Sequence, residues 1–361
     1  MGEVARAVKS GRRGRRGGRM QSMIRQTISR RLLAGMLAAL TIGASIARPE
    51  RAVARELLLA EPVHHVGFLP VYVARHKGYF KDEGVDIKIT VMVSPGFVNA
   101  VVAGDAFAFI GSVDHNAFAR TNGKNLVAVS NLLGRANIYM MARTDIAPLT
   151  GELPDYLKSK RIAVGAYGGT PNNVLRYFLR KWNLDPRKDV TLIEVGNSSI
   201  VPASIKSKQA DLGVSSEPFI TQLFNQGLWT QPIFNAGKEL GPFVDTAMSV
   251  RGDMIEKDPA TVKGIVRALV RALVYVNAHP AEMLEFARTE FPTASADDLK
   301  ASLDRAFADG IYSSDGFIVP ESWTTGETIV LEAGILKHPV GYDEVIDMRF
   351  VNEVKRELKI P

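Results

Sequence analysis

From residue 55 onward, the chain alternates between short apolar runs and longer segments whose apolar residues have helical spacing. Residues 106–111 are continuously apolar, which is typical of a strand covered on both faces. Residues 85–93 alternate between apolar and polar positions and predict a half-buried strand. Because strands and helices alternate throughout, we expect an α/β fold in which mainly parallel sheets are flanked by helices.

The strand pattern begins again near residue 139. Residues 126–131 predict the last strand before this point, and residues 161–166, 190–195 and 210–215 predict strands after it. Between them, Thr170-Pro171 begins a helix whose apolar residues share one face. We expect this middle block to form a second lobe.

Beyond residue 252 the spacing is helical to the last residues. Asp258-Pro259 begins the clearest amphipathic helix, and residues 295–308, 322–333 and 343–358 predict three more. Such helices need a surface to cover, and the first lobe supplies one.

Residues 69–87 read LPVYVARHKGYFKDEGVDI. Here Gly78 takes the left-handed position after a short helix, and Gly84 turns the chain into the next strand. The run resembles the opening of a substrate-binding protein of an ABC importer, in the group that takes up nitrate, sulfonates, taurine or thiamine-pyrimidine precursors. VAGDAFAFIGSVDHN, KRIAVGAYGGTPNN and ADLGVSSEPF resemble later segments of the same family, in the same order.

The resemblance implies a type II periplasmic-binding-protein fold with two lobes, a ligand cleft and a hinge. Lobe one is expected to comprise residues 55–138 plus 252–361, and lobe two residues 139–251, with the hinge near 138–143 and 246–252. It also implies an ABC permease and its ATPase as partners, a small-molecule ligand, no cofactor and a monomer. The chain has no P-loop pattern of its own, as expected if a separate subunit supplies the ATPase activity.

The first 54 residues predict a leader. They hold 12 Lys or Arg and two acidic residues, so the net charge of +7 comes from this segment and no nucleic-acid-binding body is expected. Residues 32–46 are apolar but short for a membrane span, and Ala52-Val53-Ala54 suits a signal peptidase. We expect export to the periplasm by the general secretory or the twin-arginine route (SRRLL, residues 29–33), and we expect residues 1–19 to precede the true start.

Cysteine is absent, which excludes disulfides, thiol catalysis and a cysteine-linked lipid anchor. The histidines form no spaced ligand set, and the neighbours His64 and His65 are expected to point apart, so we expect no metal site. The first loop that is expected to face the cleft carries His64 and His65, and His115 lies just beyond the second such loop. These three histidines are instead candidates to hydrogen-bond a ligand.

Helix starts that face the expected cleft are the other candidates for ligand contact. Their free backbone N–H groups suit an anionic or carbonyl-bearing ligand. Residues 67–69, 111–114 and 168–170 are such starts. The residues that we expect to contact ligand there are Phe68, Gly111, Ser112, Gly168, Gly169, Thr170 and Asn172.

Glu217 ends a predicted strand on the cleft side, where its carboxylate would accept hydrogen bonds from an amino group. Arg135 and Asn137 lie near the segment where the chain first passes from lobe one to lobe two, and they are weaker candidates. These groups leave two ligand classes open, a small organic anion (sulfonate, carboxylate or nitrate-like) and a nitrogen heterocycle.

Two other functions stay open on the same fold. One is an enzyme similar to thiamine-pyrimidine synthases, although their cysteine-rich motif is absent here and Phe68 stands where the resemblance places their active histidine. The other is a periplasmic sensory binding module. No GxSxG or HExxH pattern supports a hydrolase, and we expect no catalytic residues.

Overall fold

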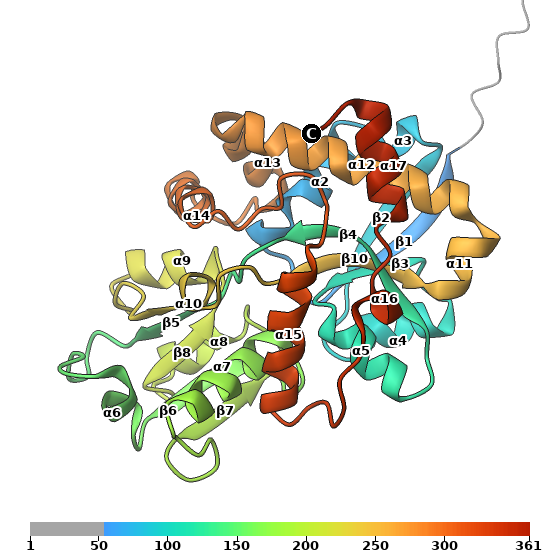
Figure 1. Ribbon diagram of the computed structural model, residues 1–361. Coiled ribbons are helices and arrows are strands. Elements are labelled where there is room, and N and C mark those ends of the chain that lie inside the picture. Colours follow the sequence, from blue (N-terminus) through green and yellow to red (C-terminus); the bar gives the residue numbers. More distant parts are fainter. Residues whose placement is uncertain (1–53) are drawn as a thin grey trace, which may run out of the picture. The chain divides into compact units, whose positions relative to one another are not determined.

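The computed structural model describes residues 54–361, which belong to one unit (Figure 1). The expected leader, with its signal peptide, SRRLL segment and later start, lies outside the described residues apart from Ala54. Among residues 54–361, no helix combines the length and the apolarity that crossing a bilayer requires.

The first of two five-stranded sheets has the strand order β2-β1-β3-β10-β4. β1 lies parallel to β2 and β3, whereas β10 is antiparallel to β3 and β4. The bounds are β1 Arg55–Glu61, β2 Val85–Val91, β3 Ala108–Gly111, β4 Leu126–Leu133 and β10 Thr246–Arg251.

The second sheet has the order β7-β6-β8-β5-β9. β6 lies parallel to β7 and β8, and β5 is antiparallel to β8 and β9. The bounds are β5 Tyr139–Ala142, β6 Arg161–Gly165, β7 Thr191–Val195, β8 Leu212–Ser215 and β9 Phe234–Asn235.

The α/β class and the predicted strands are confirmed, but the sheets are mixed rather than mainly parallel. In each sheet, two strand pairings are parallel and two are antiparallel. The antiparallel strands β10 and β5 are those that the chain enters after passing from one sheet to the other. Their apolar pattern is the same as that of a parallel buried strand, so the sequence could not reveal their direction.

The position of strand β10 does not follow the expected lobe limits. The sequence pattern assigns residues 246–251 to lobe two, but in the structure they hydrogen-bond between β3 and β4 in the first sheet. The chain leaves the first sheet after Leu133, a few residues before the first predicted hinge segment, and returns to it at Thr246, where the second predicted hinge segment begins. The lobe limits as a whole stay a prediction.

Short helices connect the strands of each sheet. Those of the first sheet are η1 Val66–Phe68, α2 Leu69–His76, α3 Tyr79–Asp82, α4 Gly96–Ala103 and α5 Asp114–Thr121. Those of the second are α6 Leu153–Leu157, α7 Thr170–Lys181, α8 Val201–Lys206, α9 Phe219–Asn225 and α10 Ala236–Leu240. Gly78 between α2 and α3 has φ 74°, which confirms the left-handed turn.

The chain is helical after β10, as predicted. These helices are α11 Gly252–Lys257, α12 Pro259–Ala278, η2 Pro280–Glu282, α13 Met283–Glu290, α14 Ala296–Ala308, α15 Pro320–Glu332, α16 Tyr342–Val345 and α17 Arg349–Leu358. The single helix predicted over residues 343–358 is two helices, because Ile346 is extended and bridges to Ala128 of β4.

Helix α12 covers the first sheet and packs against α2, α17 and β4 (Figure 1). The Asp258 carboxylate caps it by accepting from the Thr261 backbone N–H at 3.3 Å. Its predicted apolar stripe, which includes Val262 and Leu269, is buried. Each such side chain contributes about 2 kcal/mol when it leaves water.

Helix α14, from the C-terminal third, is also tied to the second sheet's part of the chain. Its Arg305 Nε donates to Glu217 Oε1 at 2.8 Å, and its Ser302 Oγ donates to Glu217 Oε2 at 3.1 Å. Glu217 has no exposed surface, and Thr221 donates two more hydrogen bonds to it. This buried carboxylate therefore joins α14 to the end of β8.

Removing the Arg305 guanidinium should leave the buried Glu217 carboxylate without a compensating charge. We expect Arg305→Met to lower the free energy of unfolding by about 3 kcal/mol, because breaking one side of a buried ion pair leaves the other side uncompensated. The matched control is Lys300→Met on the same helix, whose exposed pair with Asp304 is worth about 0.5 kcal/mol. Urea unfolding checks both variants. Equal losses in the two variants would contradict the assignment, as would a failure of Glu217→Gln to restore stability to Arg305→Met.

Candidate functional site

A cavity that is partly open to solvent lies between the two sheets. The loops that follow β1, β3, β6, β7 and β8 form its wall, together with the two segments that connect the sheets. In open α/β sheets, ligands bind at the carboxyl ends of strands, where loops and helix N-termini converge. The arrangement is therefore that of a ligand site.

Seven of the eleven predicted ligand-binding residues line this cavity. They are His65, Phe68, Gly111, Ser112, His115, Gly169 and Thr170. The other four, His64, Gly168, Asn172 and Glu217, do not. Contact of any of the eleven with a ligand stays a prediction.

The loop that follows β1 keeps the His65 ring in its neutral form. Its Nδ1 accepts the Gly67 backbone N–H at 2.9 Å, which places the proton on Nε2. Burial, together with the neighbouring His64, lowers the pKa of His65 to about 3, so this ring stays neutral at ordinary pH. Its ring centroid lies 4.0 Å from that of Phe68. The cavity wall thus includes a neutral imidazole ring beside an aromatic ring.

The wall on the β3 side combines aromatic rings with hydroxyl groups. The His115 ring lies edge-on to Phe97, with centroids 5.0 Å apart. Ser112 Oγ donates to the Val244 carbonyl at 3.2 Å, which ties the β3 end to the segment that re-enters the first sheet. On the other side, Thr170 begins α7 directly after Gly169.

Two buried polar side chains of the wall have no hydrogen-bond partner among residues 54–361. Asn137 is 2 % exposed, and neither its Oδ1 nor its Nδ2 has a partner. Ser216 is 4 % exposed, and its Oγ also has none. Such groups cost free energy in an empty site, and a polar ligand can satisfy them.

Asp245 is the carboxyl group of the wall. Burial raises its pKa to about 7; the Asn137 backbone N–H, 3.4 Å from Oδ2, opposes this shift, and Asp114 adds to it. No Lys or Arg of the described chain lines the cavity. The site therefore carries negative or neutral groups and no fixed positive charge.

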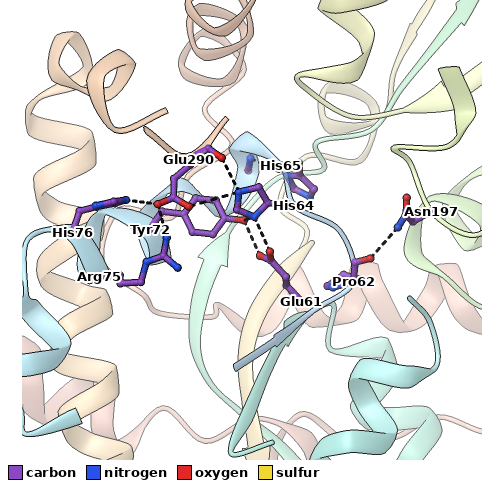
Figure 2. Close-up of polar contacts among 10 residues, drawn as sticks. Glu61, Pro62, His64, His65, Tyr72, Arg75, His76, Asn197 and Glu290 are labelled. Carbon is purple, nitrogen blue, oxygen red and sulfur yellow. Dashed lines mark hydrogen bonds and ion pairs between the residues drawn. The ribbon is translucent and has the colours of Figure 1, made fainter. Parts of the chain in front are cut away.

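His64 points away from the cavity into a polar cluster with Glu61, Tyr72 and Glu290 (Figure 2). Its Nδ1 lies 2.7 Å from Glu61 Oε1 and 2.8 Å from the Tyr72 hydroxyl, which donates to Glu61 Oε2 at 2.7 Å. Glu290 also pairs with Arg75 and His76. The cluster anchors the loop that carries His65.

The remaining candidates are occupied elsewhere. Asn172 Nδ2 donates to the Gly165 carbonyl and to Glu194 Oε1, both at 2.9 Å. Glu217 accepts hydrogen bonds from Arg305, Ser302 and Thr221, as described above. Gly168, at φ 80°, shapes the turn before α7.

Two hydrogen bonds cross from one sheet's loops to the other's beside the cavity. Asn173 Nδ2 on α7 donates to Asp114 Oδ2 on α5 at 3.0 Å. Asn197 Nδ2, after β7, donates to the Pro62 carbonyl, after β1, at 3.2 Å (Figure 2). These bonds hold the two walls together.

Sequence reasoning did not single out Asp245, Asn197 or Ser216, and it ranked Asn137 low. Each lies one or two residues beyond the end of a strand or just before one. That position was the available signal, but the sequence contains many polar residues in such places. Among the described residues, no group of His, Asp or Glu is arranged to hold a metal ion.

The family described as "NMT1/THI5 like" matches residues 65–283, which is more than half of the chain. The resemblance inferred from residues 69–87 is thus confirmed at the level of the family.

Curated relatives include binding proteins and one enzyme. The putative binding protein YtlA of Bacillus subtilis is 24% identical, over 83% of this chain and 90% of its own length. The riboflavin-binding protein RibY of Chloroflexus aurantiacus is 25% identical, over 80% and 84%. The 4-amino-5-hydroxymethyl-2-methylpyrimidine phosphate synthase of Candida albicans is 27% identical, over 73% and 78%.

Solved structures share the fold. A Bordetella bronchiseptica protein has a TM-score of 0.73 at 22% identity, over 84% of this chain and 98% of its own. The ligand-binding component of an ABC-type import system from Staphylococcus aureus has 0.68 at 13%, over 84% and 99%. The periplasmic nitrate-binding protein NrtA of Synechocystis has 0.65 at 18%, over 85% and 90%. These likenesses show that the described chain has the periplasmic-binding-protein fold.

The His64 cluster should make stability depend on pH. Burial opposes the charged ring, but the bond to Glu61 and the charges of Glu61 and Glu290 outweigh it and raise the pKa of His64. The stabilisation is therefore present below the ordinary value of 6.5 and is lost as the pH rises through the raised value.

We accordingly expect His64→Gln to lower the free energy of unfolding by about 1 kcal/mol more at pH 5.5 than at pH 8.5, the size of a partly exposed ion pair. Denaturant unfolding at the two pH values measures the difference. The exposed His338→Gln serves as the control and should show no such difference. A loss in His64→Gln that is the same at both pH values would contradict the role assigned to the cluster.

Proposed function

This chain belongs to the NMT1/THI5-like family, and on that premise we propose that it is the periplasmic solute-binding component of an ABC importer. It binds its ligand in the cavity between the two sheets and delivers it to a permease that is driven by an ATPase subunit. Export by the leader at residues 1–54 and a monomeric state are parts of the same proposal.

Of the two ligand classes, the cavity favours a small nitrogen heterocycle over an organic oxyanion. The observation that supports this choice is the cavity wall, in which Asp245, amide and hydroxyl groups and aromatic rings meet without any Lys or Arg from residues 54–361. An oxyanion there would be buried with only helix N-termini and neutral donors to balance its charge. A planar heterocycle would instead stack on the rings and pair with the amide and carboxyl groups.

The names of two relatives support this choice. One is a riboflavin-binding protein and the other synthesises a pyrimidine phosphate. The nitrate/nitrite-binding protein NrtA of Synechocystis is 25% identical over 56% of this chain and 49% of its own length, so the names of relatives do not by themselves separate the two ligand classes.

The enzyme alternative receives less support from the chain. Most relatives above are binding proteins, and one is a synthase. This sequence has no cysteine, so the synthases' cysteine-rich motif is absent. We propose binding without turnover, which means that a bound pyrimidine should be recovered unchanged after prolonged incubation.

A thermal-shift screen tests the ligand class. At a hundredfold excess over Kd, a ligand adds about 2.7 kcal/mol to stability, and we expect aminopyrimidines or riboflavin to raise Tm by about 5 °C or more. Nitrate and alkanesulfonates, tested in parallel, should raise Tm by less than about 1 °C. A shift with the oxyanions alone would overturn the proposed ligand class, and mass spectrometry of the recovered ligand would expose turnover.

A further inference from the structure

Asn137 and Asp245 adjoin each other in the cavity wall. The Asn137 backbone N–H points to Asp245 Oδ2 at 3.4 Å. The Asn137 Nδ2 lies beside the His65 ring, since a Cβ added to Gly67 would come within 3.0 Å of that nitrogen and 2.8 Å of His65 Nδ1. The three groups thus occupy one patch of the wall.

The Asn137 carboxamide has a donor and an acceptor side by side, both buried and without a partner among residues 54–361. Leaving a buried polar group unpaired costs about 1–3 kcal/mol. A ligand that presents the complementary acceptor and donor would remove that cost at two points at once.

Asp245 can present the same layout when it is protonated. A carboxylic acid has an O–H donor next to a carbonyl acceptor, as a carboxamide has an N–H donor next to a carbonyl acceptor. The surroundings favour this neutral form. Asp114 on α5 adds to the raised pKa, the His65 ring beside Asn137 is neutral, and no Lys or Arg among residues 54–361 lines the cavity.

We propose that Asn137 and the protonated Asp245 form one recognition patch for a neutral heterocycle that carries an N–H donor next to a nitrogen or oxygen acceptor. This inference rests on the proposed function. The shared chemistry is found in an aminopyrimidine, with its amino group beside a ring nitrogen, and in a lactam edge such as that of a flavin ring.

The recognition should weaken as the pH rises. Above its raised pKa of about 7, Asp245 loses its proton, so it no longer donates, and its charge faces the acceptor atom of the ligand. Because the ligand binds the protonated form, its apparent affinity should fall about tenfold for each pH unit well above that value. From pH 6 to pH 8.5 the expected loss is therefore about tenfold or more.

Calorimetric titration of the purified protein tests this at pH 6, 7 and 8.5. The probes are 4-amino-2-methylpyrimidine and riboflavin, which separate the aminopyrimidine edge from the lactam edge. Pyrimidine, which lacks the donor, should bind at least about tenfold more weakly than the probe that binds best.

Asp245→Asn separates this mechanism from charge attraction. The carboxamide keeps the donor and the acceptor but cannot ionise, so we expect binding at every pH and a flat profile. Asn137→Leu, which keeps the size but removes both polar atoms, should weaken binding about tenfold or more at all three pH values. Asp253→Asn is the matched control and should keep the wild-type profile, because this half-buried carboxylate pairs with Arg251 and does not line the cavity.

Each outcome decides one question. If neither probe binds wild-type protein at any pH, the proposed ligand class fails, and this inference fails with it. If a probe binds with a flat profile in the wild type, or loses its affinity in Asp245→Asn, only the inference fails. A pH dependence that survives in Asp245→Asn would show that a group other than Asp245 causes it and would also overturn the inference. The apo Tm of each variant shows whether it is folded.

Discussion

Polar groups buried without partners between the two sheets are the constraint on which this site depends. Strands of both sheets end at the same cavity, and their loops place amide, hydroxyl and carboxyl groups there, without a Lys or Arg from the described part of the chain. Such groups are costly to bury when unpaired. The wall is therefore complementary to a neutral polar ligand, and the fold's other features serve to hold that wall in place.

Two sets of interactions hold it. On the first sheet's side, Glu61 and Glu290 fix His64, so the loop that bears His65 is anchored away from the ligand (Figure 2). On the second sheet's side, the Glu217–Arg305 pair attaches α14 to the end of β8. These charges satisfy one another outside the cavity, which leaves the neutral groups of the wall free to meet a ligand.

Charged residues near the cleft were the hardest to place from sequence. Glu217 and His64 have the chemistry of ligand-binding groups and lie next to the wall in the chain, yet each faces a partner more than 80 residues away. Asp245 carries no pattern at all, because its importance comes from burial beside Asn137 and Asp114. Contacts at such separations are not encoded in local spacing.

The sequence by itself determined the α/β class, the position of nearly every strand, the turn at Gly78 and the family. Each of these depends on local hydrophobic periodicity or on residues adjacent in the chain. The tertiary structure alone decided the direction of β5 and β10, the place of β10 in the first sheet and the composition of the cavity wall. These depend on which distant segments pack together, and on which polar groups that packing removes from water.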